Sequence, residues 1–379
     1  MNDISIKRIN PAVEIHEASP IRTKWLAAAC LFGAAAVGAL AGVGGVSLLG
    51  NGEKSVSSAT IEKAKNATFE IICGYDTQTQ GLNYIGSAFL VDKEGHTVTS
   101  AHVTEPCGND PIYAVMRNGH VVPLKNIIAN NDTDIAVGQV PADAVRGIKP
   151  LEWETRKMAA GDKVAVVGAP HAINSSATFG AISEVDRDIG GPNSYDNHAQ
   201  NFLQTDASIN PGNSGGSVVD ARGKVAGVVT AFFSRNGGSI GLGFLTPSSL
   251  AGKVATDIIT YGQLVPGEIH VGVTDVVRYA GPGAPPEHLG IRITDDPKSI
   301  NVQSLRKGDI IVEMNKQPIR QVVDFNAAVY KTHPHDNVDV SVVRDGKLEK
   351  VTVKMGGEFP LIAERPASLA QRLAESVPR

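Results

Sequence analysis

The chain has 379 residues, a net charge of −4 with histidine neutral, 42% hydrophobic residues and 40 glycines. This length allows two or three domains with ample core, and the glycine content fits a globular, β-rich protein with many turns. The slightly acidic balance and the lack of a long basic run argue against nucleic acid as the main partner.

The N-terminal part contains a long uncharged segment. Residues 25–50 carry no charge, and about 20 apolar residues suffice to cross a bilayer as a helix. Arg22 and Lys24 precede the segment directly, so residues 1–24 are predicted to be cytoplasmic. A signal peptide cleaved after Ala41 is the alternative. Under either interpretation the rest of the chain is exported.

Short strand patterns with frequent turns dominate the middle of the chain. A polar tether at 51–60 precedes them, and they run from about residue 68 to residue 246 without interleaved helices. A helix at "PSSLAGKVATDIITYG", residues 247–262, ends this unit. Many short strands of this kind are typical of a barrel or a sandwich. The sequence therefore predicts a mainly β domain over residues 61–263.

A second, smaller unit follows a linker around "LVPGE" and covers residues 268–356, with a tail at 357–379. A helix is predicted around "DFNAAVYKT". The predicted strands lie near residues 269–274, 289–294, 308–315, 337–344 and 348–355.

Cysteine usage leaves one question open. In an oxidising compartment Cys73 and Cys107 can pair, and two unpaired buried cysteines are the alternative. No spacing of cysteine and histidine suggests a zinc site, so we expect no metal and no cofactor.

One stretch, "QTDASINPGNSGGSVVD" at 204–220, places Ser214 among turn-forming residues. A serine hydroxyl attacks poorly unless a base removes its proton and a third group orients the base. His102 follows a predicted strand among small residues, and Asp134 directly precedes an apolar strand. The order His102, Asp134, Ser214 matches a known chain order of the catalytic triad.

The glycine before the serine has a matching role. A tetrahedral intermediate carries negative charge on the former carbonyl oxygen, and backbone N–H groups must converge on that oxygen. A sharp turn through Gly212, Asn213 and Ser214 can supply two N–H donors, because Gly212 tolerates unusual backbone conformations. We therefore predict an oxyanion hole at these three residues.

Together these motifs resemble the HtrA (DegP/DegS) family of trypsin-fold serine proteases. The resemblance rests on "TSAHV", "DTDIAV", "QTDASINPGNSGGSVVD" and "GLGFLTPSS", and in the second unit on "LRKGDIIVEMNKQPIRQVVDFNAAV" and "VSVVRDGK". It covers about residues 58–356. It implies a chymotrypsin/trypsin-like double β-barrel followed by one PDZ domain, usually as a homotrimer. With the transmembrane helix, it implies a single-pass protein of the bacterial inner membrane with both domains in the periplasm.

The resemblance also implies roles for residues near the nucleophile. Ser208 takes the position at the base of the primary pocket, and Ile209 and Phe232 match positions that line it, so cleavage after small aliphatic residues is expected. The stretch 182–197 matches the family's sensor loop, and Arg187 matches its relay arginine. The family often has "GNPFG" where this chain reads "GAPHAIN", and His171 there is interpreted as a loop residue.

In the PDZ unit, the resemblance assigns capture of a peptide carboxylate to the segment "GEIHVGV". The residues concerned are Gly267, Ile269, His270, Val271, Gly272 and Val273. In PDZ domains an extended peptide adds to a sheet edge, and backbone N–H groups bind its terminal carboxylate.

Two functions fit these observations. The first is an exported endopeptidase that cleaves misfolded or regulatory proteins, including membrane-associated ones, and is regulated by C-terminal peptides at the PDZ domain. The second is a catalytically silent PDZ scaffold that binds protein C-termini. The complete set of His102, Asp134, Ser214 and the glycine turn favours the first.

Overall fold

The structure of the protein is a computed structural model. It describes residues 55–76, 81–169, 175–187, 189, 201–233, 239–278, 287–297 and 303–360. The predicted membrane segment at 25–50, the alternative cleavage after Ala41, His171 and the predicted tail beyond residue 360 lie outside the described residues. Within the described ranges, no helix is both long enough and apolar enough to span a bilayer.

The first part of the chain forms a seven-stranded antiparallel sheet in the order β5-β4-β1-β2-β3-β7-β6. Strands β2 and β3 occupy its centre, so the segment that leads into His102 begins from a buried strand. The bounds are β1 Thr68–Asp76, β2 Gly81–Leu90, β3 His96–Thr99, β4 Ile112–Val115, β5 Val121–Pro123, β6 Lys125–Asn130 and β7 Ile135–Gln139.

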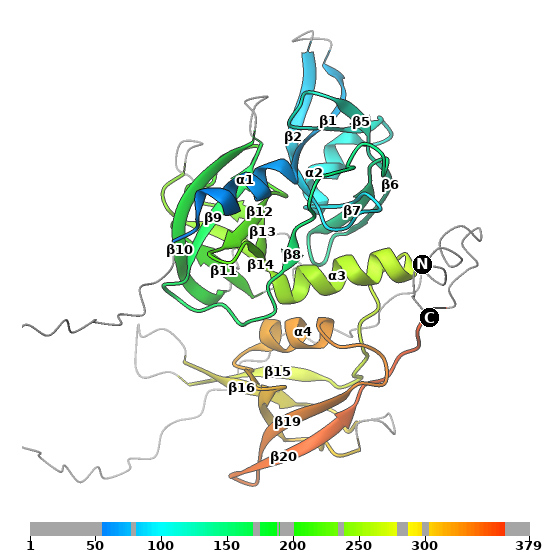
Figure 1. The fold of residues 1–379 in the computed structure, drawn as a ribbon. Helices are drawn as coiled ribbons and strands as arrows, with labels where there is room; N and C mark the ends of the chain where they lie inside the picture. The colour runs from blue at the N-terminus through cyan, green and yellow to red at the C-terminus, as the bar shows by residue number, and fades with distance from the viewer. Residues whose placement is uncertain are drawn as a thin grey trace, which may run out of the picture.

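A second seven-stranded sheet follows, in the order β12-β9-β10-β11-β14-β13-β8. An additional pairing between β12 and β13 closes this sheet on itself. The expected mainly β architecture is therefore confirmed (Figure 1). The bounds are β8 Glu152–Trp153, β9 Lys163–Gly168, β10 Ser176–Arg187, β11 Phe202–Thr205, β12 Ser217–Asp220, β13 Lys224–Phe232 and β14 Gly243–Pro247.

Helix α1, Ser58–Asn66, overlaps the segment that the sequence predicts as a polar tether. The Ser57 hydroxyl accepts a hydrogen bond from the N–H of Thr60 at 3.2 Å, which caps the helix. Ile61 and Ala64, three positions apart, are buried against the protein. Capping and burial outweigh the polar composition, so the helix begins within the predicted tether.

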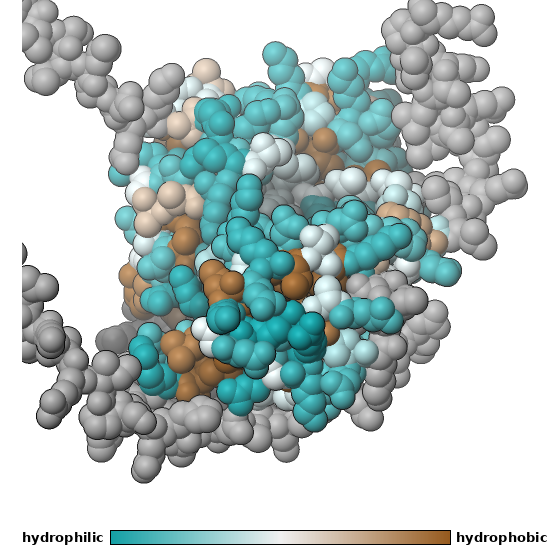
Figure 2. Space-filling view, turned by 90° about the horizontal axis from the view of Figure 1, so that it is seen from below, coloured by the Kyte–Doolittle hydropathy of each residue, from teal (hydrophilic) through white to brown (hydrophobic). Residues whose placement is uncertain are grey.

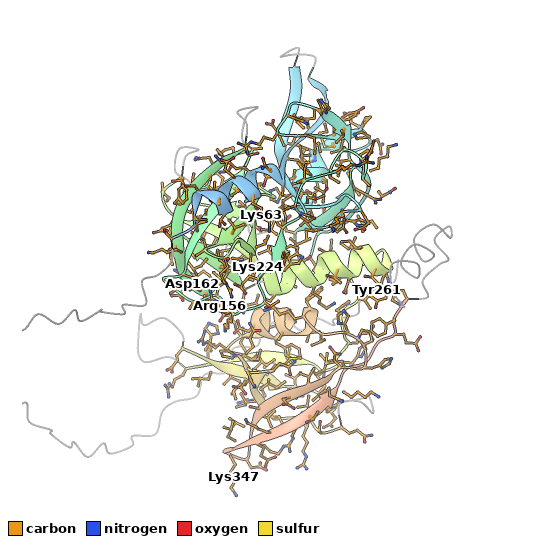
Figure 3. All side chains as sticks on the ribbon, in the orientation of Figure 1. Lys63, Arg156, Asp162, Lys224, Tyr261 and Lys347 are labelled. Atoms are coloured by element: carbon orange, nitrogen blue, oxygen red, sulfur yellow. A yellow bond between two sulfur atoms is a disulfide. The ribbon has the colours of Figure 1, made fainter. Side chains whose placement is uncertain are left out.

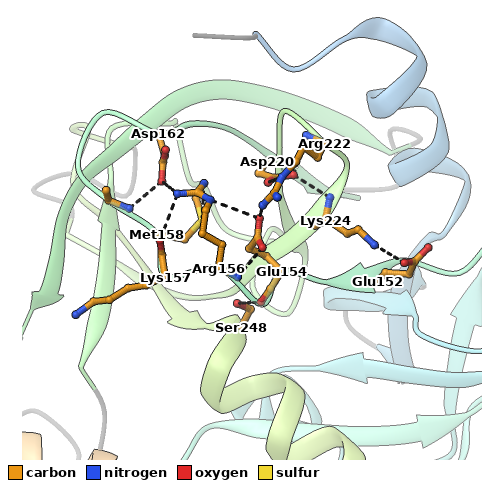
Figure 4. A network of polar contacts seen from close by, with 11 residues as sticks. Glu152, Glu154, Arg156, Lys157, Met158, Asp162, Asp220, Arg222, Lys224 and Ser248 are labelled. Carbon is orange, nitrogen blue, oxygen red and sulfur yellow. Dashed lines mark hydrogen bonds and ion pairs between the residues drawn. The ribbon is translucent and has the colours of Figure 1, made fainter. Parts of the chain in front are cut away.

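Helix α3, Ser248–Tyr261, crosses the lower side of the two sheets (Figure 1). At its first residue, the buried Ser248 hydroxyl donates to the Glu154 carbonyl oxygen at 2.7 Å. The Glu154 carboxylate is buried and pairs with Arg222, whose guanidinium also binds Asp220 at 3.0 Å (Figure 4). This network attaches the start of α3 to the second sheet.

The PDZ unit has a sheet in the order β15-β16-β17-β19-β20, with β18 paired to β17. Strand β15 lies at an edge of this sheet, and it begins at residue 273 although the sequence predicts a strand from residue 269. Two short helices, α2 and the 3-10 helix η1, complete the elements. The remaining bounds are α2 Ala101–Thr104, η1 Glu105–Cys107, β15 Val273–Arg278, β16 Glu287–Ile293, β17 Ile310–Met314, β18 Gln317–Pro318, α4 Val322–Tyr330, β19 Asn337–Arg344 and β20 Lys347–Lys354.

Three buried apolar clusters form the core of the protein. One joins the first sheet with α1 and α3, a second fills the second sheet, and a third fills the PDZ unit. Charged side chains spread over the outer surface, from Lys63 on α1 to Lys347 at the far end of the PDZ unit (Figure 3). The face seen from below is mostly polar, with small apolar patches (Figure 2). Helix α4 lies between α3 and strands β15 and β16 (Figure 1).

Candidate active site

His102 lies in the short helix α2, directly after the central strand β3. Its Nδ1 is 2.9 Å from both carboxylate oxygens of Asp134. A carboxylate can only accept, so this contact places the proton of the neutral ring on Nδ1 and leaves Nε2 as an acceptor. The backbone N–H of His102 also donates to Asp134 Oδ1 at 3.0 Å, which fixes the carboxylate beneath the ring.

Asp134 is held in an unusual conformation at the start of β7. Its φ is +52°, a region that aspartate tolerates better than most residues. Its carbonyl oxygen accepts a hydrogen bond from the N–H of Ala101 at 3.1 Å, and the residue is 4% exposed. The backbone thereby directs a buried carboxylate at the imidazole.

The environment sets the proton affinity of His102. Burial by itself lowers the pKa of the imidazole, but the hydrogen bond and the charge of Asp134, with a smaller contribution from Glu105, hold the pKa above its ordinary value. A histidine of this kind can accept a proton and stabilise the resulting charge near neutral pH.

Ser214 lies in a turn between β11 and β12 that two glycines make possible. Gly212 has a φ of +92° and Gly215 a φ of +78°, where other residues are strained. A Cβ at Gly215 would lie 2.3 Å from the carbonyl oxygen of Ser87 and 2.9 Å from the N–H nitrogen of Ser100. The turn therefore presses directly against the first sheet, and only glycine fits at that contact.

Most backbone polar groups of this turn have defined partners. The N–H of Asn213 donates to the carbonyl of Asn210 at 3.0 Å, and the N–H of Gly216 donates to the carbonyl of Asn213 at 2.9 Å. The N–H of Gly215 donates to the carbonyl of Val229 at 2.8 Å.

Two N–H groups remain. Within the described residues, those of Gly212 and Ser214 have no hydrogen-bond partner. Because a trans peptide points its N–H opposite to its C=O, the bond from Gly216 to the Asn213 carbonyl turns the Ser214 N–H the other way. Gly212 and Ser214 are thus the members of the predicted oxyanion hole with available donors, and Asn213 spaces them.

The nucleophile candidate and the histidine meet at the junction of the two sheets. A Cβ at Gly86 would lie 2.8 Å from the side chain of Val103 and 2.9 Å from the carbonyl oxygen of Ser214. Gly86 therefore allows the turn of Ser214 to approach the helix of His102. No hydrogen bond joins Ser214 Oγ to His102 among the residues the structure describes, and such bonds are often long in ligand-free enzymes. Serine, histidine, aspartate and backbone donors require no metal or cofactor for acyl transfer.

The predicted pocket residues lie beside this turn. Ile209 is fully buried in the core of the second sheet, and Phe232 packs against the same cluster while partly exposed. Gly243 on β14 was missed by the sequence reasoning, and a Cβ there would lie 2.4 Å from Ile209 Cδ1. The carbonyl of Ser208 accepts a hydrogen bond from the Thr178 hydroxyl at 2.7 Å.

Only residues 182–187 and 189 of the predicted sensor loop are described. Arg187 Nε donates to Gln204 Oε1 on β11 at 3.0 Å, so it contacts the strand that leads toward Ser214. Asp186, with a φ of +55°, pairs with Lys157 at 3.3 Å. Asp186 and Lys157 both line a cavity of about 170 Å³, and Lys331 of the PDZ unit also lines it.

The predicted carboxylate segment precedes the edge strand β15. Ile269, Val271 and Val273 pack against the PDZ core while partly exposed. The carbonyl of Gly272 accepts a hydrogen bond from Thr294 at 2.9 Å, and the exposed His270 lies 3.7 Å from Glu268. In the described part of the chain, the N–H groups from residue 269 to residue 272 have no partner. The N–H of Gly267 donates to Thr332 at 3.1 Å.

A disulfide joins Cys73 and Cys107. Cys73 lies on β1, and Cys107 ends the η1 turn that directly follows the helix of His102. The bridge therefore attaches the chain just beyond His102 to the first sheet.

Helix α4 of the PDZ unit contacts the protease unit at two points that the sequence did not suggest. The Tyr330 hydroxyl donates to Asp132 at 3.2 Å, and Asp324 accepts from the buried amide of Asn201 at 2.7 Å. Beside them, His333 Nε2 lies 2.8 Å from the buried carboxylate of Asp257 on α3. Only a tertiary structure could reveal these pairs, because each joins residues at least 76 positions apart.

Family comparisons agree with this geometry. Residues 86–228 match the trypsin-like peptidase domain, and residues 283–355 match the PDZ domain.

Curated relatives point the same way. The chain is 31% identical over 279 residues to a probable periplasmic serine endoprotease, DegP-like, of Halomonas elongata, which covers 72% of the chain and 56% of the relative. It is 28% identical over 310 residues to the serine endoprotease DegS of Haemophilus influenzae, which covers 81% of the chain and 86% of the relative. The chain spans about half the length of the DegP-like relatives it matches.

Solved structures resemble most of this chain. The HtrA-type protease AlgW with a decapeptide is 28% identical, with a TM-score of 0.57, and the match covers 81% of this chain and 100% of that chain. The serine endoprotease from Yersinia pestis is 25% identical, with a TM-score of 0.51, and covers 78% of this chain and 96% of that chain.

Proposed function

Because the chain belongs to the HtrA group of trypsin-fold serine proteases and carries one PDZ domain, we propose that it is an exported serine endopeptidase whose PDZ domain reads protein C-termini. One observation carries the proposal. The turn that presents Ser214 leaves the Gly212 and Ser214 N–H groups available next to the His102–Asp134 pair.

The reaction follows from these positions. His102 Nε2 takes the proton of Ser214 Oγ as that oxygen attacks the peptide carbonyl, and Asp134 holds the Nδ1–H and stabilises the imidazolium. The N–H groups of Gly212 and Ser214 bind the oxyanion, and His102 then protonates the leaving amine. Water repeats the sequence on the acyl-enzyme and regenerates Ser214.

Peptide recognition is assigned to the edge of the PDZ sheet. Strand β15 is an edge strand, and the four N–H groups that precede it have no partner within the described residues. A C-terminal peptide can therefore extend the sheet at β15, with its carboxylate at residues 269–272 and its last side chain on Val271 and Val273. The last residue of the peptide is expected to be apolar.

We assign regulation to the sensor loop, whose described part lines a cavity together with this domain. Arg187 bonds to β11, and Asp186 lines a cavity that Lys331 of the PDZ unit also lines, so the described part of the loop lies close to both domains. A peptide changes activity only by the difference in its affinity for the resting and the active states.

The substrates, location and assembly follow the family. The proposed substrates are misfolded or regulatory proteins, among them membrane-associated ones. The proposed cleavage sites follow small aliphatic residues, whose side chains would enter a pocket lined by Ile209 and Phe232. The proposal also includes the periplasm as location, a single-pass inner-membrane anchor at residues 25–50, and a homotrimer.

Cleavage of casein by the full chain tests the proposal, with Ser214→Ala as the matched inactive variant. Wild-type cleavage with loss by at least about a thousandfold in Ser214→Ala is expected, since only the oxyanion hole and binding remain. Peptide binding without cleavage in either protein would instead support a PDZ scaffold.

A further inference from the structure

Ser87 on β2 is a buried serine that contacts the turn formed by residues 212–214, and the proposed reaction does not use it. It is fully buried, and the three residues that follow it in the strand, Ala88, Phe89 and Leu90, are buried and apolar. Its hydroxyl donates to the carbonyl oxygen of Gly212 at 2.6 Å and accepts from the N–H of Ala169 at 2.9 Å. Its backbone N–H donates to the carbonyl oxygen of Ser214 at 2.8 Å.

These contacts fix two peptide planes. The bond from the Ser87 hydroxyl holds the Gly212 carbonyl toward the first sheet, and the Asn213 N–H on the same peptide then points to Asn210. The bond from the Ser87 N–H holds the peptide that follows Ser214. One residue of the first sheet thus restrains the turn on both sides of Asn213.

A rotation of the Gly212–Asn213 peptide would disturb the oxyanion donors. Gly212 has a φ of +92° and no side chain, so the turn itself offers little resistance to such a rotation. A buried carbonyl without its donor costs free energy, which favours rearrangement of the peptide.

We propose that Ser87 is a positioning residue for the oxyanion hole. Its hydrogen bond to the Gly212 carbonyl keeps the N–H groups of Gly212 and Ser214 pointing toward the position of the oxyanion. The inference rests on the proposed protease function. It concerns the transition state, because the oxyanion forms only there, and not the binding of substrate.

The test compares Ser87→Ala with Ser248→Ala. Ser248 is also a buried serine that donates to a backbone carbonyl, that of Glu154 at 2.7 Å, but it lies at the start of α3. Removing a direct oxyanion donor costs about 10²–10³ in kcat, so loss of a residue that positions one is expected to cost about 10- to 100-fold.

For Ser87→Ala we expect this fall in kcat with KM unchanged, and weaker inhibition by a peptide boronic acid, whose adduct with Ser214 places an oxygen in the hole. The acid limb of the pH profile should stay in place, since His102 and Asp134 are untouched. Ser248→Ala should keep the wild-type kcat although its stability falls to a similar extent.

A kcat within twofold of wild type in Ser87→Ala would overturn the inference, and so would equal losses in both variants. If Ser87→Ala does not fold, Ser87→Cys keeps the volume with a weak S–H donor, and its kcat must fall at constant KM. If neither wild type nor Ser214→Ala cleaves casein, the proposed function fails and the inference with it. Cleavage by wild type together with normal turnover in the Ser87 variants overturns the inference alone.

Discussion

Asp132, two residues before the carboxylate that orients His102, accepts a hydrogen bond from Tyr330 of the PDZ helix α4 at 3.2 Å. Burial raises the pKa of Tyr330, and the charge of Asp132 raises it further, so the phenol stays protonated and remains a donor. The PDZ domain thus touches the turn in which Asp134 holds a positive φ.

Tyr330→Phe removes only the hydroxyl from this contact. A hydrogen bond to a charged acceptor contributes about 1.5–3 kcal/mol, of which part would reach the Asp134 turn. We expect kcat for casein to fall about two- to tenfold with C-terminal peptide affinity unchanged. Tyr113→Phe, at an exposed position of strand β4, is the control and should leave kcat unchanged. Equal kcat in Tyr330→Phe and wild type would show that the hydrogen bond between Tyr330 and Asp132 has no effect on catalysis.

The pH dependence of cleavage follows from His102. As pH falls through the raised pKa of the imidazole, the base becomes protonated and activity is lost, so the acid limb of kcat/KM should lie above about pH 6.5. Glu105→Gln removes one charge that raises this pKa, and the limb should move to lower pH. Glu94→Gln, an exposed carboxylate in another turn, is the control. An unmoved limb in Glu105→Gln at low ionic strength would contradict the influence of Glu105 on His102.

The disulfide between Cys73 and Cys107 should stabilise the protease domain. The two residues are 34 positions apart, and closure of such a loop is worth about 3–4 kcal/mol in the chain-entropy model. The double variant Cys73→Ser/Cys107→Ser is expected to lose about this free energy of unfolding in urea titrations. Reductant should destabilise the wild type and leave the double variant unchanged. A wild type insensitive to reductant would speak against a stabilising bridge.

Ile209 is expected to limit the residue accepted before the cleaved bond. Ile209→Ala should open space beside Gly243 and allow larger apolar residues, at a stability cost of about 2–5 kcal/mol. Mapping of the cut sites in an unfolded protein measures the change. Ile71→Ala, equally buried on β1 of the first sheet, should cost similar stability without altering the cut sites. A majority of cuts after Lys or Arg in the wild type would refute the pocket assignment.

Arg187 should relay peptide binding to the protease. We expect apolar C-terminal peptides to raise the cleavage rate several-fold. C-terminally amidated peptides should have no effect, because the N–H groups of residues 269–272 are expected to bind a terminal carboxylate. Arg187→Ala, which removes the bond to Gln204, should blunt activation while peptide affinity stays constant. Calorimetry and casein cleavage measure the two separately. Peptides that bind without changing the rate would make the PDZ domain a tether.

Local patterns predicted much of this molecule. Strand alternation and turn residues indicated the mainly β fold, and "PSSLAGKVATDIITYG" indicated helix α3, because both depend on neighbours in the chain. The helix at Ser58–Asn66 was not predicted, since its cap and its burial against the sheets outweigh a polar composition. The beginning of β15 at residue 273 also differs from the predicted strand, because pairing with β16 decides it.

For the candidate site, the sequence alone determined the chemical groups and their order: His102, Asp134, Ser214 and the flanking glycines. Glycine at 212 and 215 is dictated by backbone conformations that the chain must adopt locally. Only the tertiary structure decided which N–H groups stay available and which residues hold them so. Ser87 lies 125 positions from Gly212, and Tyr330 lies 198 positions from Asp132. Contacts of that separation depend on how the sheets and the PDZ helix pack, which no local pattern encodes.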